Sequence, residues 1–309
     1  LPLAGMGSNT VAGEIEGYQE GTAAHNILFS RYLNQLQDYL EGNSWLDKAY
    51  VYWFDEPAAK DYRYVKAGMD RIHGAAPKLT RLLTAPVKAN LVGSVDIWCP
   101  GTSNYNPADA EARRASGEKV WWYVRTMPKS PYAGLFIDHY AVEMRIWLWQ
   151  TWKYKVDGIL VWHTNYWTRP LASSDREPQN PYRDTMSYSA VDGCSVSDSG
   201  YWGNGDGRLL YPPKSAFDGQ KSIDGPVNSI RWEMLREGIE DYEYFWLLNA
   251  QVNRLKNLDP QNPLIREAEG FLNVPETIVV NITDFSADPA PIYAHRSELA
   301  RMIETLSKQ

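Results

Sequence analysis

The stretch YVYWFDEP at residues 50–57 holds both the clearest element of the fold and the first candidate for chemistry. Its apolar and aromatic residues run without interruption until they meet Asp55, Glu56 and Pro57. Such a run, bounded by turn residues, is typical of a strand that is buried on both faces of a sheet. We therefore predict a core strand that ends where two carboxylates begin.

On either side of this strand the chain alternates between apolar runs and segments whose apolar residues lie three and four positions apart, as in amphipathic helices. The predicted strands cover residues 48–55, 78–85, 94–101, 119–125, 158–167 and 277–283. The predicted helices cover residues 25–40, 58–74, 106–117, 137–158, 229–255 and 296–306. Strands that alternate with helices indicate a parallel sheet covered by helices on both faces.

Two α/β architectures have this element order, an open doubly wound sheet and an eightfold βα-barrel. The glycine-rich phosphate-binding fingerprint is absent after the first strand, which disfavours a dinucleotide-binding sheet. The alternating region contains about five βα units, fewer than the eight of a barrel. We predict an α/β fold of the (β/α)8 TIM-like barrel type, with its first strands upstream of Leu1. Residues 1–255 would form the later part of the barrel, and residues 256–309 an extension that packs on it.

The segment at residues 168–225 is rich in Pro, Ser, Asp and Gly. It is too long for an ordinary connection, so we predict a functional loop. Within it, the sequence NGDGR at residues 204–208 lacks the later acidic ligands of a calcium loop and indicates a turn.

The composition argues against several classes of function. A hydrophobic share of 44% with 22% charged residues is that of a globular protein. The net charge of −7 and the lack of a basic run argue against nucleic acid as a partner, because phosphate binding needs clustered cations. No apolar stretch is long enough to cross a membrane. The cysteines, Cys99 and Cys194, and the histidines lack metal-ligand spacing, so we predict no metal and no cofactor; whether the cysteines are bridged stays open.

The aromatic residues favour a carbohydrate ligand. The chain has 13 Trp and 20 Tyr but only 7 Phe, so most of its aromatic rings carry a polar group. Such side chains offer an apolar face together with a hydrogen-bonding end. Sugars match this chemistry, because their C–H faces stack on rings while their hydroxyls need partners. A Trp-rich core is the alternative for each individual ring.

The Asp55-Glu56 pair has a structural and a chemical interpretation. An acid just before a proline at the first helical position is a common way to start a helix. In α/β barrels, however, the chemistry lies at the C-terminal ends of strands, where this pair is expected. Two adjacent carboxylates repel each other, and such repulsion raises the pKa of one group, as a general acid requires.

The adjacency of the two acids limits the reactions they can catalyse. Most glycosidases place two carboxylates on opposite sides of the sugar bond, and neighbours on one strand cannot easily do so. The strands predicted at residues 119–125 and 158–167 contain no second acid. Glu56 could instead protonate the leaving oxygen while Asp55 holds a 2-acetamido group of the substrate that acts as the nucleophile.

Several stretches resemble the catalytic domain of glycoside hydrolase family 123, the β-N-acetylgalactosaminidases. These are the Asp-Glu-Pro strand end and the sequences DGILVWHTNYW at residues 157–167, GNGDGRLLYPP at 203–213 and GPVNSIRWEMLREGIEDYEYFWLL at 225–248. The last two are the most specific. The resemblance extends from about Gly21 to Leu248 and more loosely into the tail.

The resemblance implies a β/α-barrel, normally preceded by β-sandwich material, in exported bacterial enzymes, so we expect a periplasmic or extracellular location although the chain shows no signal peptide. It also implies a retaining mechanism through an oxazolinium intermediate. Asp55 would orient the acetamido group, and Glu56 would act first as acid and then as base. The partner would be a glycan or the carbohydrate part of a glycolipid.

Strand-end position suggests further residues for the sugar site, with core packing as the alternative for each: Trp98, Tyr123, Trp162, Asn165 and Trp167. Two questions stay open at this level. The sugar could be N-acetylgalactosamine or another, such as N-acetylglucosamine. The chain could also be a non-catalytic carbohydrate-binding or structural module.

Overall fold

The computed structural model describes residues 13–167, 180–183, 185, 203–213 and 225–309. Most of the loop predicted to be functional, at residues 168–225, therefore lies outside the described residues. The chain folds into two compact units, Leu1–Tyr123 and Val124–Gln309. The division expected at residue 255 stays a prediction; the helix α5 (Ile230–Leu258) spans that position.

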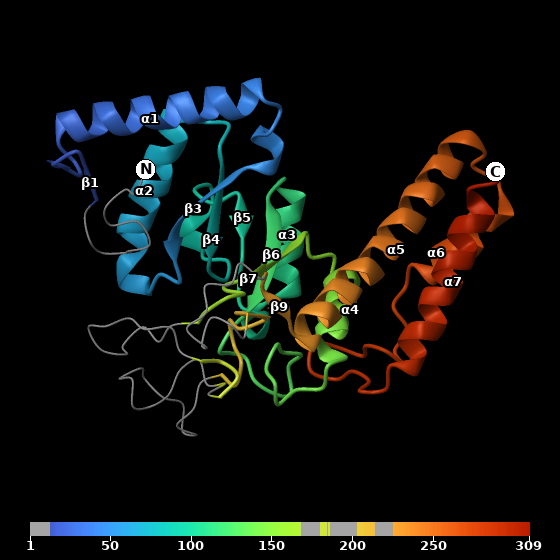
Figure 1. Ribbon diagram of the computed structural model, residues 1–309. Coiled ribbons are helices and arrows are strands. Elements are labelled where there is room, and N and C mark those ends of the chain that lie inside the picture. Colours follow the sequence, from blue (N-terminus) through green and yellow to red (C-terminus); the bar gives the residue numbers. More distant parts are fainter. Residues whose placement is uncertain (1–12, 168–179, 184, 186–202, 214–224) are drawn as a thin grey trace. The chain divides into compact units, whose positions relative to one another are not determined.

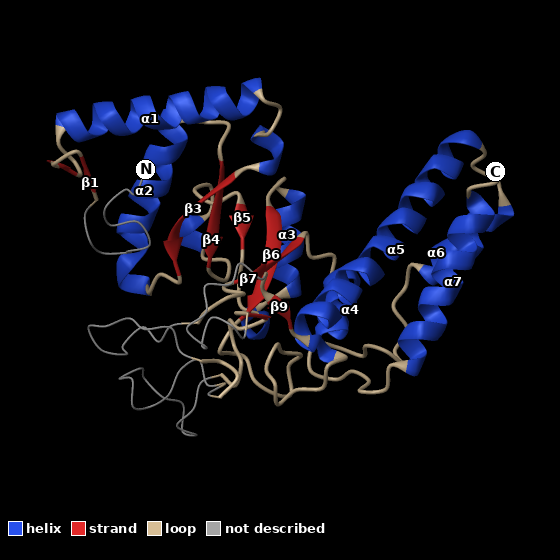
Figure 2. Cartoon of the chain, viewed as in Figure 1, coloured by secondary structure: helices blue, strands red, loops and turns tan. Residues whose placement is uncertain are grey.

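The central element is a parallel sheet, drawn in red in Figure 2. Its strands follow the order of the chain: β3 (Tyr50–Asp55), β4 (Thr80–Thr84), β5 (Ile97–Trp98), β6 (Lys119–Val124) and β7 (Gly158–Val161). β3 pairs with β4, β4 with β5 and β5 with β6, each in parallel. The α/β class and the five strands of the alternating region are confirmed, whereas a closed eight-stranded barrel stays a prediction.

The first unit covers its strands with helices (Figure 1). Its helices are α1 (Ala23–Gly42), α2 (Tyr62–Ala75) and α3 (Pro107–Ala115), and β1 (Glu14–Ile15) pairs with β2 (Tyr18–Gln19). Four 3₁₀ turns are also described: Leu46–Lys48, Ala59–Asp61, Ala89–Leu91 and Thr102–Asn104. Phe29 of α1, Met69 of α2 and Phe54 of β3 belong to one buried hydrophobic cluster, so α1 and α2 share a core with the sheet. All three helices were predicted.

The packing of α2 on β3 requires a glycine. A Cβ at Gly68 would lie 2.7 Å from Cε2 of Phe54 and closer still to Cζ, whereas nothing lies within 4 Å of a Cβ at Gly74 of the same helix. We expect Gly68→Ala to lower the free energy of unfolding by about 1–3 kcal/mol, because it overpacks the core. Gly74→Ala should instead raise it by up to about 1 kcal/mol through helix propensity. Urea unfolding curves of the two variants test this, and equal midpoints would contradict it.

The second unit is mainly helical. Its described helices are α4 (Glu143–Lys153), α5 (Ile230–Leu258), α6 (Pro263–Phe271) and α7 (Ala290–Leu306), and β8 (Leu210–Tyr211) pairs with β9 (Val227–Asn228). α5 packs against α4, α6 and α7, and it lies beside α7 in Figure 1. The helix predicted at residues 229–255 is confirmed; it begins after Ser229, whose hydroxyl accepts the backbone N–H of Trp232.

Two predictions about this unit were wrong in extent or type. The helix predicted at residues 137–158 begins only at Glu143, whose carboxylate accepts the backbone N–H groups of Gly134 and Tyr140 ahead of the helix. The strand predicted at residues 277–283 does not form. The side chain of Asn281 there accepts the backbone N–H groups of Thr283 and Asp284, and this local turn competes with strand pairing.

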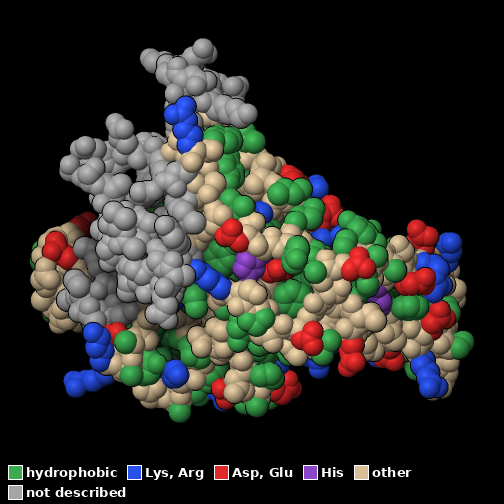
Figure 3. Space-filling view, turned by 90° about the horizontal axis from the view of Figure 1, so that it is seen from below, with side chains coloured by type: hydrophobic (Ala, Val, Ile, Leu, Met, Phe, Trp, Pro, Cys, Tyr) green, Lys and Arg blue, Asp and Glu red, His purple; other side chains and the backbone are tan. Residues whose placement is uncertain are grey.

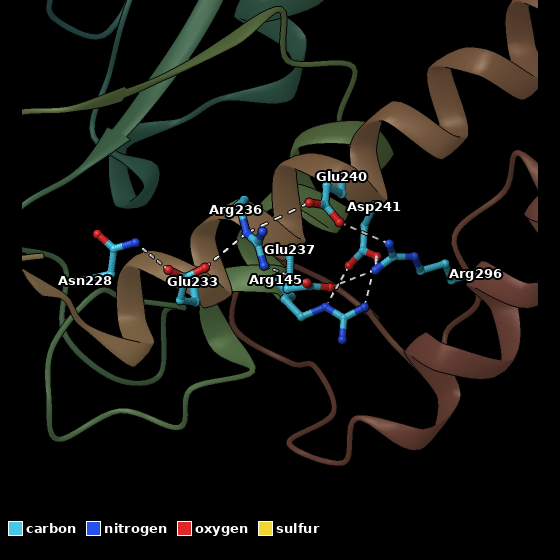
Figure 4. A network of polar contacts seen from close by, with 8 residues as sticks. All are labelled: Arg145, Asn228, Glu233, Arg236, Glu237, Glu240, Asp241 and Arg296. Atoms are coloured by element: carbon cyan, nitrogen blue, oxygen red, sulfur yellow. Dashed lines mark hydrogen bonds and ion pairs between the residues drawn. The ribbon is translucent and has the colours of Figure 1, made fainter. Parts of the chain in front are cut away.

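A buried ion pair joins two helices of this unit (Figure 4). The guanidinium of Arg145 on α4 donates from Nε and Nη2 to the carboxylate of Asp241 on α5, at 2.8 and 2.9 Å. Nε1 of Trp149 donates to the same carboxylate at 2.9 Å, and Arg296 of α7 approaches it to 3.3 Å. Asp241 has no exposed surface and Arg145 has 1%. The Asp241 carboxylate on α5 therefore links this helix to α4 and α7.

The surface carries charges of both signs. On the face drawn in Figure 3, Lys and Arg side chains of the described residues are scattered among Asp and Glu rather than gathered into one patch. Scattered cations do not form the dense positive surface that phosphate backbones require. Of the helices in the described part of the chain, none combines the length and the apolar character needed to span a membrane.

Candidate active site

The candidate site in the first unit is built from the carboxyl ends of its strands. Asp55 is the last residue of β3, Thr84 is the last residue of β4, and Tyr123 lies next to the end of β6. The carboxyl ends of parallel strands meet at one edge of a sheet, so residues far apart in the sequence come together. Asp55 and Glu56 are exposed at this edge. The strand before them is less buried than predicted, because β3 is the first strand in the sheet order and only Phe54 in it is fully buried.

Two hydroxyl groups hold the carboxylate of Asp55. The hydroxyl of Tyr52 donates to Oδ1 at 2.5 Å, and Oγ1 of Thr84 donates to the same oxygen at 2.7 Å. Burial and the neighbouring Asp55 carboxylate raise the pKa of the Tyr52 hydroxyl well above its usual value. Tyr52 therefore stays protonated and remains a donor throughout the working range of a protein.

Glu56 has an unusual backbone conformation and a buried partner. Its φ of 41° lies in the left-handed region, which costs a non-glycine residue about 1–3 kcal/mol. The hydroxyl of Tyr123, which is only 7% exposed, donates to Oε1 of Glu56. Strained backbone of this kind gathers at functional sites, where the surrounding contacts hold it in place. A simple helix start would not require it.

The structure places Trp98 and Cys99 beneath the sheet edge rather than on it. Trp98 has no exposed surface, and its Nε1 donates to Oε2 of Glu118 at 2.5 Å. This placement favours core packing over sugar contact for Trp98. Cys99 is a buried free thiol whose pKa is raised, first by burial and then by the charge of Asp55. A thiol in this state is a poor nucleophile.

The other three residues suggested for the sugar site lie in the second unit. Trp162 and Trp167 are half-buried and Asn165 is exposed. Nε1 of Trp162 donates to Oδ2 of Asp206 at 3.1 Å, and Nε1 of Trp167 donates to the carbonyl of Leu210 at 2.8 Å. Asn165 forms an isolated bridge with Arg208. The role of these three residues in binding stays a prediction.

Asp206 lies within the glycine-rich turn at residues 203–208, and Arg231 binds this turn from outside it. Gly205 and Gly207 have φ values of 77° and 67°, so the predicted turn is confirmed. Burial raises the pKa of the Asp206 carboxyl to about 6. Arg231 of α5 donates to the carbonyls of Gly205 and Arg208 and thereby ties the turn to the helix. Neither role was inferred from the sequence, although both residues lie in its most distinctive stretches.

The geometry of the first unit defines what the site can do chemically. Two consecutive carboxylates lie at an exposed sheet edge, and three hydroxyl groups surround them. The described residues include no group of three or more His, Cys, Asp and Glu side chains arranged to hold a metal ion. The side chains that are present can transfer a proton and stabilise a positive charge, which are the two tasks of carboxylates in glycosidases.

Comparison with known proteins points to one family. A family model described as the catalytic domain of glycoside hydrolase 123 matches residues 8–248. A solved family 123 glycoside hydrolase from Clostridium perfringens, from a study of glycolipid glycan hydrolysis, resembles the chain with a TM-score of 0.54 and 18% sequence identity. The similarity covers 96% of this chain and 47% of that one, so the chain spans about half the length of that structure. No curated protein matches the chain.

Proposed function

The chain belongs to glycoside hydrolase family 123, and we propose that it removes a terminal β-linked N-acetylgalactosamine by a retaining, substrate-assisted mechanism. The observation that carries the proposal is the Asp55-Glu56 pair at an exposed strand end, with hydroxyl donors on both carboxyl groups. Consecutive carboxylates cannot easily flank one anomeric carbon, so the nucleophile comes from the substrate. We propose an exported enzyme, as the family resemblance implies, that acts on glycan or glycolipid termini.

In the first step the carbonyl oxygen of the 2-acetamido group attacks the anomeric carbon. The bond from that carbon to the leaving oxygen breaks, and the leaving oxygen takes a proton from Glu56. Asp55 accepts the acetamido N–H and stabilises the positive charge of the resulting oxazolinium ring. In the second step water attacks the same carbon, gives a proton to Glu56 and reopens the ring. Two displacements at one carbon retain its configuration.

Tyr123 contributes by orienting the acid. A hydroxyl that donates to Oε1 of Glu56 directs the acidic proton onto the other carboxyl oxygen, in one fixed rotation of the group. We expect Tyr123→Phe to lower kcat about 10- to 150-fold, because the hydrogen bond to the charged form is worth about 1.5–3 kcal/mol, while KM changes little. Steady-state kinetics test this. A loss confined to KM would assign Tyr123 to sugar binding instead.

Release of nitrophenol from the aryl β-N-acetylgalactosaminide tests the proposed reaction. The N-acetylglucosaminide is assayed in parallel, because the ratio of the two rates identifies the sugar. A thiazoline, which mimics the oxazolinium ring, should inhibit turnover if the acetamido group participates. Turnover that the thiazoline does not affect would contradict the mechanism. Binding of the sugar without any turnover would favour a non-catalytic carbohydrate-binding module.

A further inference from the structure

An irregularity in the pairing of β3 with β4 brings Tyr52 to the side of Asp55. Tyr52 pairs with Leu82 and Asp55 with Thr84, but the register shifts between Tyr52 and Phe54, so Trp53 is an extra residue. In a regular strand, residues three positions apart point to opposite faces. The bulge restores both side chains to one face, and bulges near active sites commonly redirect side chains in this way.

The hydroxyl of Thr84 connects both members of the acidic pair. It donates to Oδ1 of Asp55 at 2.7 Å and accepts the backbone N–H of Glu56 at 2.9 Å. The hydroxyl of Tyr52 lies 3.3 Å from it and completes the group. Thr84 is only 3% exposed, so it is part of the support beneath the site rather than its surface.

We propose that Thr84 and Tyr52 are positioning residues, which fix the carboxylate of Asp55 and the backbone of Glu56 in the geometry that the reaction needs. The proposal rests on the proposed function. Two donors on one carboxyl oxygen oppose rotation about the Cβ–Cγ bond of Asp55, because rotation breaks both hydrogen bonds. The bond from the Glu56 N–H to Thr84 holds the left-handed conformation that aims the acid. Small displacements of catalytic groups reduce rates strongly, so such support is functional.

Two substitutions at Thr84 distinguish the effect of its hydroxyl from the effect of its shape: valine keeps the shape without the hydroxyl, and serine keeps the hydroxyl. We expect Thr84→Val to lower kcat 10- to 100-fold with a change in KM of less than about threefold, and Thr84→Ser to recover most of the rate because it keeps the hydroxyl. Tyr52→Phe should lower kcat by a smaller factor. Thr80→Val, at the other end of β4, is the matched control and should behave as wild type.

A second readout distinguishes positioning from general damage to the fold. Substrates with an N-trifluoroacetyl group react slowly when the acyl oxygen is the nucleophile, because fluorine weakens it. If Thr84→Val misplaces Asp55, it should narrow the rate difference between N-acetyl and N-trifluoroacetyl substrates. A variant that merely folds less well loses both rates in proportion. Wild-type kcat and an unchanged rate ratio in Thr84→Val would overturn the proposal.

Crystal structures of wild type, Thr84→Ser and Thr84→Val test the positioning of Asp55 without relying on enzyme activity. We expect the Asp55 carboxylate to keep its position in the serine variant and to turn away in the valine variant. An inactive wild-type enzyme would overturn the proposed function, yet this comparison would still decide whether the hydroxyl positions Asp55. An unmoved Asp55 in Thr84→Val would overturn the inference even if the enzyme were active.

Discussion

Glu56→Gln is expected to lower kcat/KM for an aryl β-N-acetylgalactosaminide by about 10²–10⁴-fold, the usual contribution of a general acid-base. Glutamine keeps the size of the side chain and can still accept from Tyr123, so the fold and the affinity should change little. It cannot donate a proton to the leaving oxygen. Steady-state kinetics with circular dichroism of the variant provide the test.

Varying the pKa of the leaving group tests specifically whether Glu56 is the general acid. A phenol of low pKa departs without help from an acid. In Glu56→Gln, the rate of the first step should therefore fall least for dinitrophenyl glycosides and most for alkyl glycosides. Glu111→Gln is a matched control, because Glu111 lies on the exposed surface of α3 and pairs only with Arg114 among the ion pairs described. An equal loss on every leaving group would show that Glu56 is not the acid.

The second large effect is on stability. Asp241→Ala should lower the free energy of unfolding by about 3–5 kcal/mol, because it leaves the buried guanidinium of Arg145 without its carboxylate partner. Chemical denaturation monitored by tryptophan fluorescence is a suitable measurement, since Trp149 donates to the same carboxylate.

A matched control uses an exposed ion pair of the same unit. Glu267 pairs with Arg301, and both side chains are about half exposed. Glu267→Ala should therefore change stability by no more than about 1 kcal/mol. Both substitutions remove one carboxylate from an arginine partner, but Asp241 is buried and also contacts Arg296 and Trp149, so the comparison contrasts a buried cluster with an exposed pair. If Asp241→Ala lowered the free energy of unfolding by less than about 1 kcal/mol, water or a neighbouring group would have to stabilise the charge of Arg145 in place of the carboxylate.

Local signals in the sequence were sufficient to predict most elements of the fold. The apolar run before Asp55 specifies a strand, although β3 is only partly buried, and Asn106-Pro107 marks the start of α3, where the Asn106 side chain accepts two backbone N–H groups. Ser229 starts α5 in the same way. These signals are reliable because the alternation of a strand and the cap of a helix depend only on residues a few positions apart in the sequence.

Local signals were insufficient where contacts beyond the local pattern decided the outcome. The apolar run at residues 277–283 has strand character, but Asn281 forms a turn within it. For Trp98, strand-end position left sugar contact and core packing both open, and the structure buries its indole against Glu118. Both outcomes depend on neighbours that periodicity does not reveal.

The sequence by itself determined the α/β class and the strand that ends at Asp55, with two consecutive acids at its end. Only the tertiary structure decided which groups support that pair. Thr84 lies 28 residues after Glu56, and Tyr123 lies 67 residues after it. The bulge at Trp53 is likewise a property of the pairing of two strands. Strand register is set by how whole faces pack against the core, so contacts between strand ends arise only when the sheet has formed.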